Sequence, residues 1–110
     1  MAQMGREFKV MDKLDSLFQL RELLLQMERD VGLDVLSTPE RDVFLAAHSL
    51  ASKRGEIVES LQIRSHGLVR PMAQATYHRS LRTLLKLGLL ERACGSKAKS
   101  YVVRSDLVTR

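Results

Sequence analysis

The stretch from residue 73 to residue 104 constrains the fold of this chain more than any other part of the sequence. It begins with a segment of helical period, AQATYHRSLRTLLKLG, continues through LLERAC and a short basic loop, GSKAK, and ends in SYVVR. Apolar residues three and four positions apart share one side of a helix. A buried face is therefore expected at Leu81, Leu84, Leu85 and Leu87. The segment predicts a helix over about 73–87 followed by a two-stranded hairpin over about 89–104, with its strands at 89–93 and 100–104.

The opposite side of this predicted helix is polar and cationic. Its outward residues are Gln74, Ala75, Thr76, His78, Arg79 and Arg82. The major groove of DNA is wide enough for a helix and shows a distinct donor and acceptor pattern for each base pair. The planar group of Arg79 can pair with a guanine or a phosphate, whereas Arg82, Lys97 and Lys99 are expected to contact phosphates. The sequence thus predicts a site for double-stranded DNA.

The distribution of charge favours a polyanionic partner for the second half of the chain. Residues 1–55 contain 8 Lys and Arg against 9 Asp and Glu, residues 56–110 contain 10 against 4, and the net charge is +5. A cationic balance alone is also typical of an ordinary basic soluble protein. The inference therefore depends on the placement of the charges on the predicted helix and hairpin.

Length and composition favour a small globular protein. The 110 residues, 45% of them hydrophobic, are enough for one domain with an appended helix. No apolar run approaches the roughly 20 residues that span a bilayer, and the N-terminus lacks the apolar core of a secretory signal. The single cysteine, Cys94, cannot form an internal disulfide. We therefore expect a cytoplasmic protein without a membrane segment.

The sequence contains no catalytic or metal-binding constellation. His48, His66 and His78 do not share a metal-ligand spacing, and a lone cysteine adds no cluster. There is also no phosphate-cradling glycine motif and no nucleophile elbow. We expect neither enzymatic activity nor a metal or cofactor, and the sequence does not identify a small-molecule effector.

A long amphipathic helix is predicted over about residues 8–31, with Gly32 as its stop. Its apolar stripe is broad and contains Met11, Leu14, Leu17, Phe18, Leu24, Leu25 and Met27. A helix with such a stripe must lie against the domain, against a second copy of itself, or against both. The predicted organisation is a helical segment and possible dimerisation element at residues 1–36, followed by a binding domain at residues 37–110.

Two shorter helices are predicted between these parts. Ser37 and Glu40 have capping-box spacing, so a helix should begin there and end near residues 53–55. Its expected buried face is Val43, Phe44, Ala47, Leu50 and Ala51. The next helix is expected from about Glu56 to His66, burying Ile57, Val58 and Leu61. Gly67 is predicted to end it in the left-handed conformation.

The order helix, helix, connection, helix and basic hairpin is that of a winged helix-turn-helix. Residues 37–104 resemble the DNA-binding core of MarR-type bacterial transcription regulators. The stretch ATYHRSLRTLLKLGLLER is similar to that family's recognition helix and its entry into the wing. The resemblance implies a mainly α fold with a small β-hairpin, a recognition helix in the major groove and a wing on the flanking backbone. It places Gln74, Ala75, Thr76, His78 and Arg79 toward bases or phosphates, Arg82 at the backbone, and Lys97 and Lys99 at the wing tip.

Two features depart from the family pattern. Ala73 stands where a Ser or Thr helix cap is usual, and the connection from His66 to Met72 is longer than a tight turn. The family dimerises through N- and C-terminal helices, and residues 105–110 are too few for a substantial helix. A homodimer would then rely on the helix at about residues 8–31.

These inferences lead to one expectation and two alternatives. We expect a sequence-specific, double-stranded-DNA-binding transcriptional regulator that acts as a homodimer on two half-sites. One alternative is a winged-helix protein–protein interaction module that does not bind DNA. The other is a DNA-binding protein of phage or plasmid replication or partition.

Overall fold

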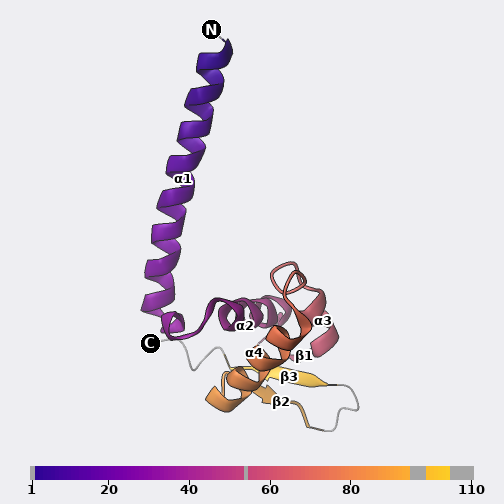
Figure 1. The fold of residues 1–110 in the computed structure, drawn as a ribbon. Coiled ribbons are helices and arrows are strands. Elements are labelled where there is room, and N and C mark those ends of the chain that lie inside the picture. Colours follow the sequence, from indigo (N-terminus) through magenta and orange to yellow (C-terminus); the bar gives the residue numbers. More distant parts are fainter. Residues whose placement is uncertain (1, 54, 95–98, 105–110) are drawn as a thin grey trace. The chain divides into compact units, whose positions relative to one another are not determined.

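The chain divides into two units, Met1–Asp34 and Val35–Arg110. A computed structural model describes residues 2–53, 55–94 and 99–104, with side chains described from residue 10 onward. The first unit contains one helix, α1 (Ala2–Asp30), and a turn of 3-10 helix, η1 (Leu33–Val35), follows (Figure 1). The predicted N-terminal helix is confirmed, although it begins at Ala2 rather than near residue 8. Gly32 follows it, as predicted for this stop, with a φ of 80° in the left-handed region.

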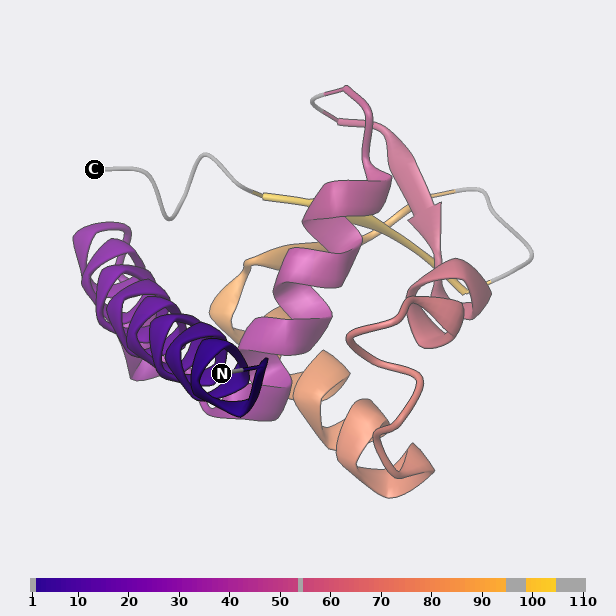
Figure 2. The same cartoon turned by 90° about the horizontal axis from the view of Figure 1, so that it is seen from above.

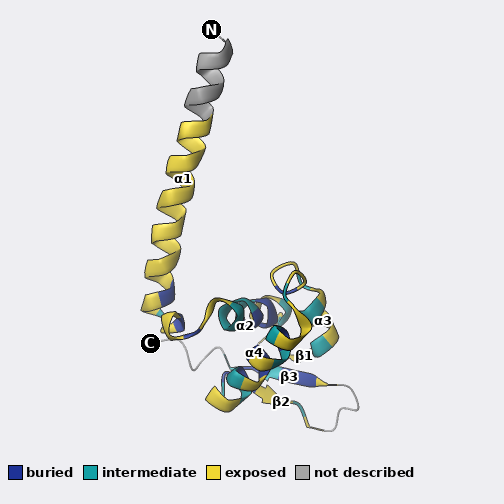
Figure 3. Ribbon diagram, in the orientation of Figure 1, coloured by how far each residue is buried: buried dark blue, intermediate teal, exposed yellow. Residues whose placement is uncertain are grey.

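The described surface of α1 is almost entirely exposed (Figure 3). Its large apolar side chains retain between 50% and 63% of their exposure. They are Val10, Met11, Leu14, Leu17, Phe18, Leu20, Leu23, Leu24, Leu25 and Met27. At 3.6 residues per turn these positions occupy most of the circumference and leave a narrow polar strip at residues 12, 15, 19, 22 and 26. The apolar surface is therefore wider than a single stripe.

The second helix, α2 (Thr38–Leu50), begins at the predicted capping box. Ser37 Oγ accepts a hydrogen bond from the Glu40 amide at 3.4 Å, and Glu40 Oε1 accepts one from the Ser37 amide at 2.8 Å. Two amides that have no partner within the helix are thereby satisfied. The helix ends at Leu50, before the predicted end at residues 53–55, because Ala51 is extended. Arg54 lies outside the described residues.

The predicted helix over residues 56–66 is wrong in its first half. Ile57–Glu59 form a strand, β1, and only Ser60–Ser65 form a helix, α3. Val58 is buried as predicted, but Ile57 and Leu61 are 52% and 75% exposed. Short β-branched runs fit helix or strand equally well by periodicity, and a pairing partner far along the chain decides between them.

The end of α3 also differs from the prediction. Gly67 does not have a positive φ. The helix ends at Ser65, where His66 becomes extended and its amide bonds to the Ile63 carbonyl. The left-handed stop expected at Gly67 is therefore unnecessary.

The C-terminal strands form the predicted hairpin and pair with β1 in a three-stranded antiparallel sheet. Strands β2 (Leu90–Arg92) and β3 (Ser100–Val103) are neighbours, and the strand order is β1-β3-β2. In the register, Val58 and Arg92 both lie opposite Tyr101, on the two sides of β3. The second unit is thus helical with a small antiparallel sheet.

The helix α4 (Gln74–Leu87) agrees closely with its prediction. Ala73 precedes it without a side-chain cap, and Gly88 ends it with a φ of 79°. Leu81 and Leu84 are buried and Leu85 is half-buried, as expected for the inner face. The prediction that Leu87 is buried is wrong, because this last helical residue is 54% exposed where the chain turns at Gly88.

The core of the second unit lies between α2, α4 and the sheet. Helix α2 contacts α3, α4 and β3, and α4 also contacts β2 (Figure 2). The buried apolar side chains are Leu36, Val43, Phe44, Ala46, Ala47, Val58, Ile63, Val69, Tyr77, Leu81, Leu84, Leu89, Leu90, Tyr101 and Val103. This packing holds the inner face of α4 against the sheet and leaves its outer face exposed.

The capping box gives a direct test of this part of the fold. We expect Ser37→Ala to lower the free energy of unfolding by about 0.5–2 kcal/mol, because the Glu40 amide loses its acceptor. Ser52→Ala changes an exposed serine outside the helices and should stay within about 0.5 kcal/mol of the wild type. Urea titrations of both variants measure the difference, and equal stability of the two would contradict the assignment.

Candidate nucleic-acid interface

The predicted site residues on α4 lie on its outer face, but they do not all converge. Gln74, Ala75, Arg79 and Arg82 are exposed, while Thr76 and His78 are half-buried. Arg79 Nη2 donates to Thr76 Oγ1 at 3.4 Å. Lys99, just before β3, is exposed as well. Lys97 lies outside the described residues.

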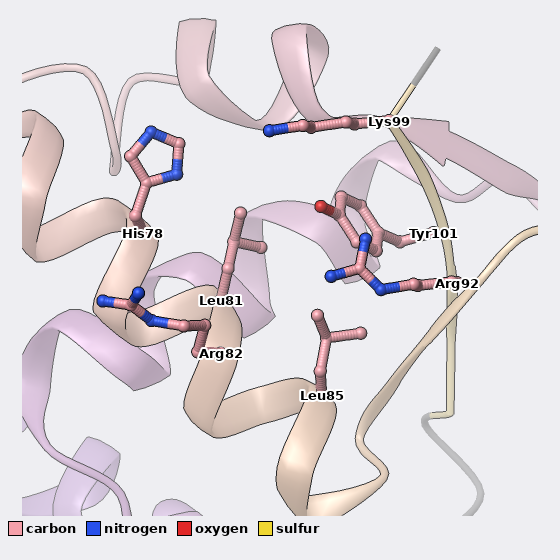
Figure 4. Close-up of a pocket in the computed structure, with 7 residues that line it drawn as sticks. All are labelled: His78, Leu81, Arg82, Leu85, Arg92, Lys99 and Tyr101. Carbon is pink, nitrogen blue, oxygen red and sulfur yellow. The ribbon is translucent and has the colours of Figure 1, made fainter. Parts of the chain in front are cut away.

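Three of the predicted residues meet at a hollow between α4 and the sheet. The hollow has a volume of about 440 Å³. Its lining consists of His78, Leu81, Arg82 and Leu85 from α4, and of Arg92, Lys99 and Tyr101 from β2, β3 and the residue before β3. Figure 4 shows the nitrogen-bearing side chains arranged around an apolar floor of Leu81, Leu85 and Tyr101. A ligand in this hollow would contact two elements at once.

The hollow is strongly cationic. The side chains of Arg82, Arg92 and Lys99 form no hydrogen bond or ion pair with any residue in the described part of the chain. Arg104 differs, because its guanidinium forms an ion pair with the Glu91 carboxylate. Three uncompensated positive charges beside one another repel, and a bound anion would relieve that repulsion. The hollow is therefore suited to an anionic group.

Sequence reasoning missed Arg92 and Tyr101 as members of this site. The two residues are cross-strand partners on β2 and β3. Their pairing follows from the register of the hairpin, which the sequence of the loop did not specify. The sequence offered one signal for Arg92, which is a basic residue near the end of the first predicted strand.

The connection between α3 and α4 is organised around the guanidinium of Arg64. Nη1 donates to the Val69 carbonyl at 2.8 Å, and Nη2 donates to the Met72 carbonyl at 2.7 Å. The guanidinium carbon also lies 5.4 Å from the centroid of the Tyr77 ring, which is cation–π geometry. Because Arg64 holds both carbonyls, the connection has a defined shape despite its length.

Gln74 is already engaged by other side chains. Its Oε1 accepts a hydrogen bond from Arg64 Nε at 3.1 Å, and its Nε2 lies 3.0 Å from His78 Nε2. Both polar ends of the Gln74 amide therefore have partners within the protein. This network connects the α3–α4 connection to a residue of the hollow.

Tyr77 joins α4 to the start of α3 beneath the surface. Its hydroxyl donates to the Ser60 carbonyl at 3.1 Å and lies 2.8 Å from Ser60 Oγ, which then donates to it. The ring is 1% exposed. Burial raises the pKa of the Tyr77 phenol above its ordinary value near 10.0, and the Ser60 hydrogen bond opposes this rise. Tyr77 is therefore a core residue rather than a base-stacking group.

The described residues show no group of three His, Cys, Asp or Glu side chains that could hold a metal ion. Within the same ranges, no helix combines the length and apolar character required to cross a bilayer. Cys94 is exposed and unpaired. Comparison of the chain with protein families, curated proteins and solved structures found no match.

The buried phenol of Tyr77 makes stability depend on alkaline pH. Its raised pKa means that the folded state binds the proton more tightly, so the contribution is full below about pH 10 and decreases as the pH rises further. We expect Tyr77→Phe to cost about 1–3 kcal/mol near neutral pH, because the Ser60 groups lose their partner. This difference from the wild type should shrink above about pH 10 in urea titrations. A stability difference between Tyr77→Phe and the wild type that stays constant from neutral to alkaline pH would contradict the burial of an ionisable phenol.

Proposed function

We propose that this chain is a winged-helix protein that binds double-stranded DNA in a sequence-specific manner and regulates transcription by occupying its site. Helix α4 would enter the major groove, and the β2–β3 hairpin would lie on the flanking backbone. The single observation behind this proposal is the cationic hollow, in which Arg82 of α4 meets Arg92 and Lys99 of the hairpin region.

The chemistry of the hollow supports a phosphodiester as its occupant. Unpaired Arg and Lys groups supply most of the affinity of proteins for the phosphate backbone. Because the cations come from both α4 and the sheet, a backbone phosphate in the hollow would orient both elements on the duplex. The exposed side chains of Ala75 and Arg79 would then lie on the part of α4 that is available to base edges.

The order of elements also supports the proposal. Two helices, a connection, a third helix and a hairpin follow one another, and β1 pairs with the hairpin. The order of the helices and the hairpin is the one expected from the resemblance to MarR-type regulators, whereas β1 was not expected. The fold alone does not establish function, so the argument depends on the charged hollow.

Salt dependence of DNA binding tests the proposal. We expect the wild-type protein to select particular sequences from a random duplex pool and to lose affinity as salt increases. Arg82→Gln should weaken binding to all sequences alike and reduce the slope of log affinity against log salt by about 1, because one phosphate contact is lost. Fluorescence anisotropy at several salt concentrations measures both effects.

Lys53→Gln provides a matched control with the same loss of charge. Lys53 is exposed and precedes β1. The first residue of β1, Ile57, pairs with Val102 near the C-terminal end of β3, whereas Lys99 precedes the N-terminal end of β3. The control should keep the wild-type slope. Equal slopes for Arg82→Gln and Lys53→Gln would reject the hollow as a phosphate site, and a protein that binds no duplex would favour a protein-interaction module.

We further propose that α1 associates with α1 of a second copy to form a homodimer. Each exposed apolar side chain of α1 that a second copy covers would contribute roughly 1 kcal/mol on losing its remaining exposure. Residues 2–30 contain five basic and six acidic residues, so two copies would not repel strongly. A twofold dimer would also match two DNA half-sites.

Charges placed on α1 test this association. Leu17→Glu combined with Leu24→Glu puts two carboxylates on the apolar side, whereas Gln19→Glu combined with Gln26→Glu puts the same charges on the polar strip. We expect the wild type and the double variant at Gln19 and Gln26 to sediment as dimers. The double variant at Leu17 and Leu24 should sediment as a monomer. A wild type that sediments as a monomer at the same concentration would overturn the proposal.

A further inference from the structure

The hydrogen bonds around Gln74 determine how its amide is oriented. Arg64 has no acceptor atoms, so the atom of Gln74 that faces Arg64 Nε at 3.1 Å must be the carbonyl oxygen. The amide nitrogen therefore faces His78. This assignment does not depend on an arbitrary choice between the two ends of the amide, because the reverse orientation would place two donors together.

The orientation of Gln74 in turn determines the state of His78. An amide NH₂ only donates, so His78 Nε2, at 3.0 Å, must accept. A ring nitrogen that accepts carries no proton, and the proton of the neutral ring is then on Nδ1. In water, neutral histidine favours the opposite tautomer with the proton on Nε2, so the network selects the less common form.

The remaining donor faces the hollow. In Figure 4 the ring nitrogen next to the attachment point of the side chain, Nδ1, lies on the side of Leu81, and the other nitrogen lies on the far side. His78 lines the hollow together with Arg82, Arg92 and Lys99. The Nδ1–H group can therefore donate to a ligand that the three cations attract.

We propose that Arg64 and Gln74 are positioning residues that hold His78 as the Nδ1–H tautomer, and that this group donates a hydrogen bond to an anionic phosphodiester oxygen in the hollow. This inference rests on the proposed function for the identity of the ligand. It assigns His78 a directional role in which the cations attract the phosphate and the imidazole fixes the position of one of its oxygens. Gln74 then acts through His78 and does not need to contact DNA itself.

The tautomer is measured directly by ¹⁵N chemical shifts of the His78 ring in the free protein at about pH 8. We expect the Nδ1–H pattern in the wild type. Gln74→Met removes the amide at an exposed position of similar length, and His78 should then change to the Nε2–H pattern. Gln19→Met makes the same replacement on α1 and should leave the His78 shifts unchanged. An Nε2–H wild type, or a Gln74→Met variant with the wild-type pattern, would overturn the network.

DNA binding tests the donor. In the His78→Asn variant, the side-chain amide lies near the position that Nδ1 has in the histidine. In the His78→Gln variant, the longer side chain puts its amide near the position of Nε2. We expect His78→Asn to bind duplex DNA within a few-fold of the wild type and His78→Gln to bind about tenfold more weakly. Both variants should keep the wild-type salt slope, because neither loses a cation. Equal affinities of the two variants, or a reduced slope, would overturn the donor role.

The two measurements separate this inference from the proposed function. A wild-type protein that binds no duplex DNA would overturn the proposed function and the ligand assigned here. An Nε2–H tautomer in a protein that does bind DNA would overturn the network and the donor role of His78, and would leave the proposed function standing.

Discussion

The position of α4 depends on the guanidinium of Arg64. This one side chain donates to the carbonyls of Val69 and Met72, to the Gln74 amide, and lies over the Tyr77 ring. The connection between α3 and α4 contains Pro71 and consists of turns, in which the amides of Val69 and Arg70 bond to the His66 carbonyl, and Arg64 adds donors from outside it. Arginine is suited to this role because its donors form a rigid, planar fork and it is always protonated. Tyr77, bonded to Ser60, fixes the same junction from the buried side.

The two units of the chain use apolar residues in different ways. In the second unit, the inner face of α4 is covered by the core, and its outer face and the hairpin form a cationic hollow with an apolar floor. In α1, the apolar side chains have no comparable cover. Helices of globular proteins gain most of their stability from packing. The proposed DNA site and the proposed dimer thus arise from two separate surfaces, one defined by unpaired charge and the other by exposed apolar area.

Much of the fold could be predicted because its signals are local. The capping box of Ser37 and Glu40, the left-handed stops at Gly32 and Gly88, and the inner face of α4 depend on residues within a few positions of one another. The errors occurred where residues far apart in the sequence determine the secondary structure or the burial of a side chain. Ile57 and Val58 became a strand because residues 101 and 102 pair with them, and Leu87 became exposed because the core does not reach the end of α4. The site was predicted in part: His78, Arg82 and Lys99 converge, but Arg92 joins them only through the hairpin register.

The sequence by itself determined the long N-terminal helix, the boundaries of α4, the hairpin after Gly88 and the concentration of positive charge in the second half of the chain. These features follow from periodicity, capping and composition, which act over short distances. Only the tertiary structure decided that β1 completes the sheet, that Arg64 holds the connection, and that Arg64 orients the Gln74 amide. Each of these depends on hydrogen-bond partners from different elements, whose distances are set by packing of the whole domain rather than by spacing along the chain.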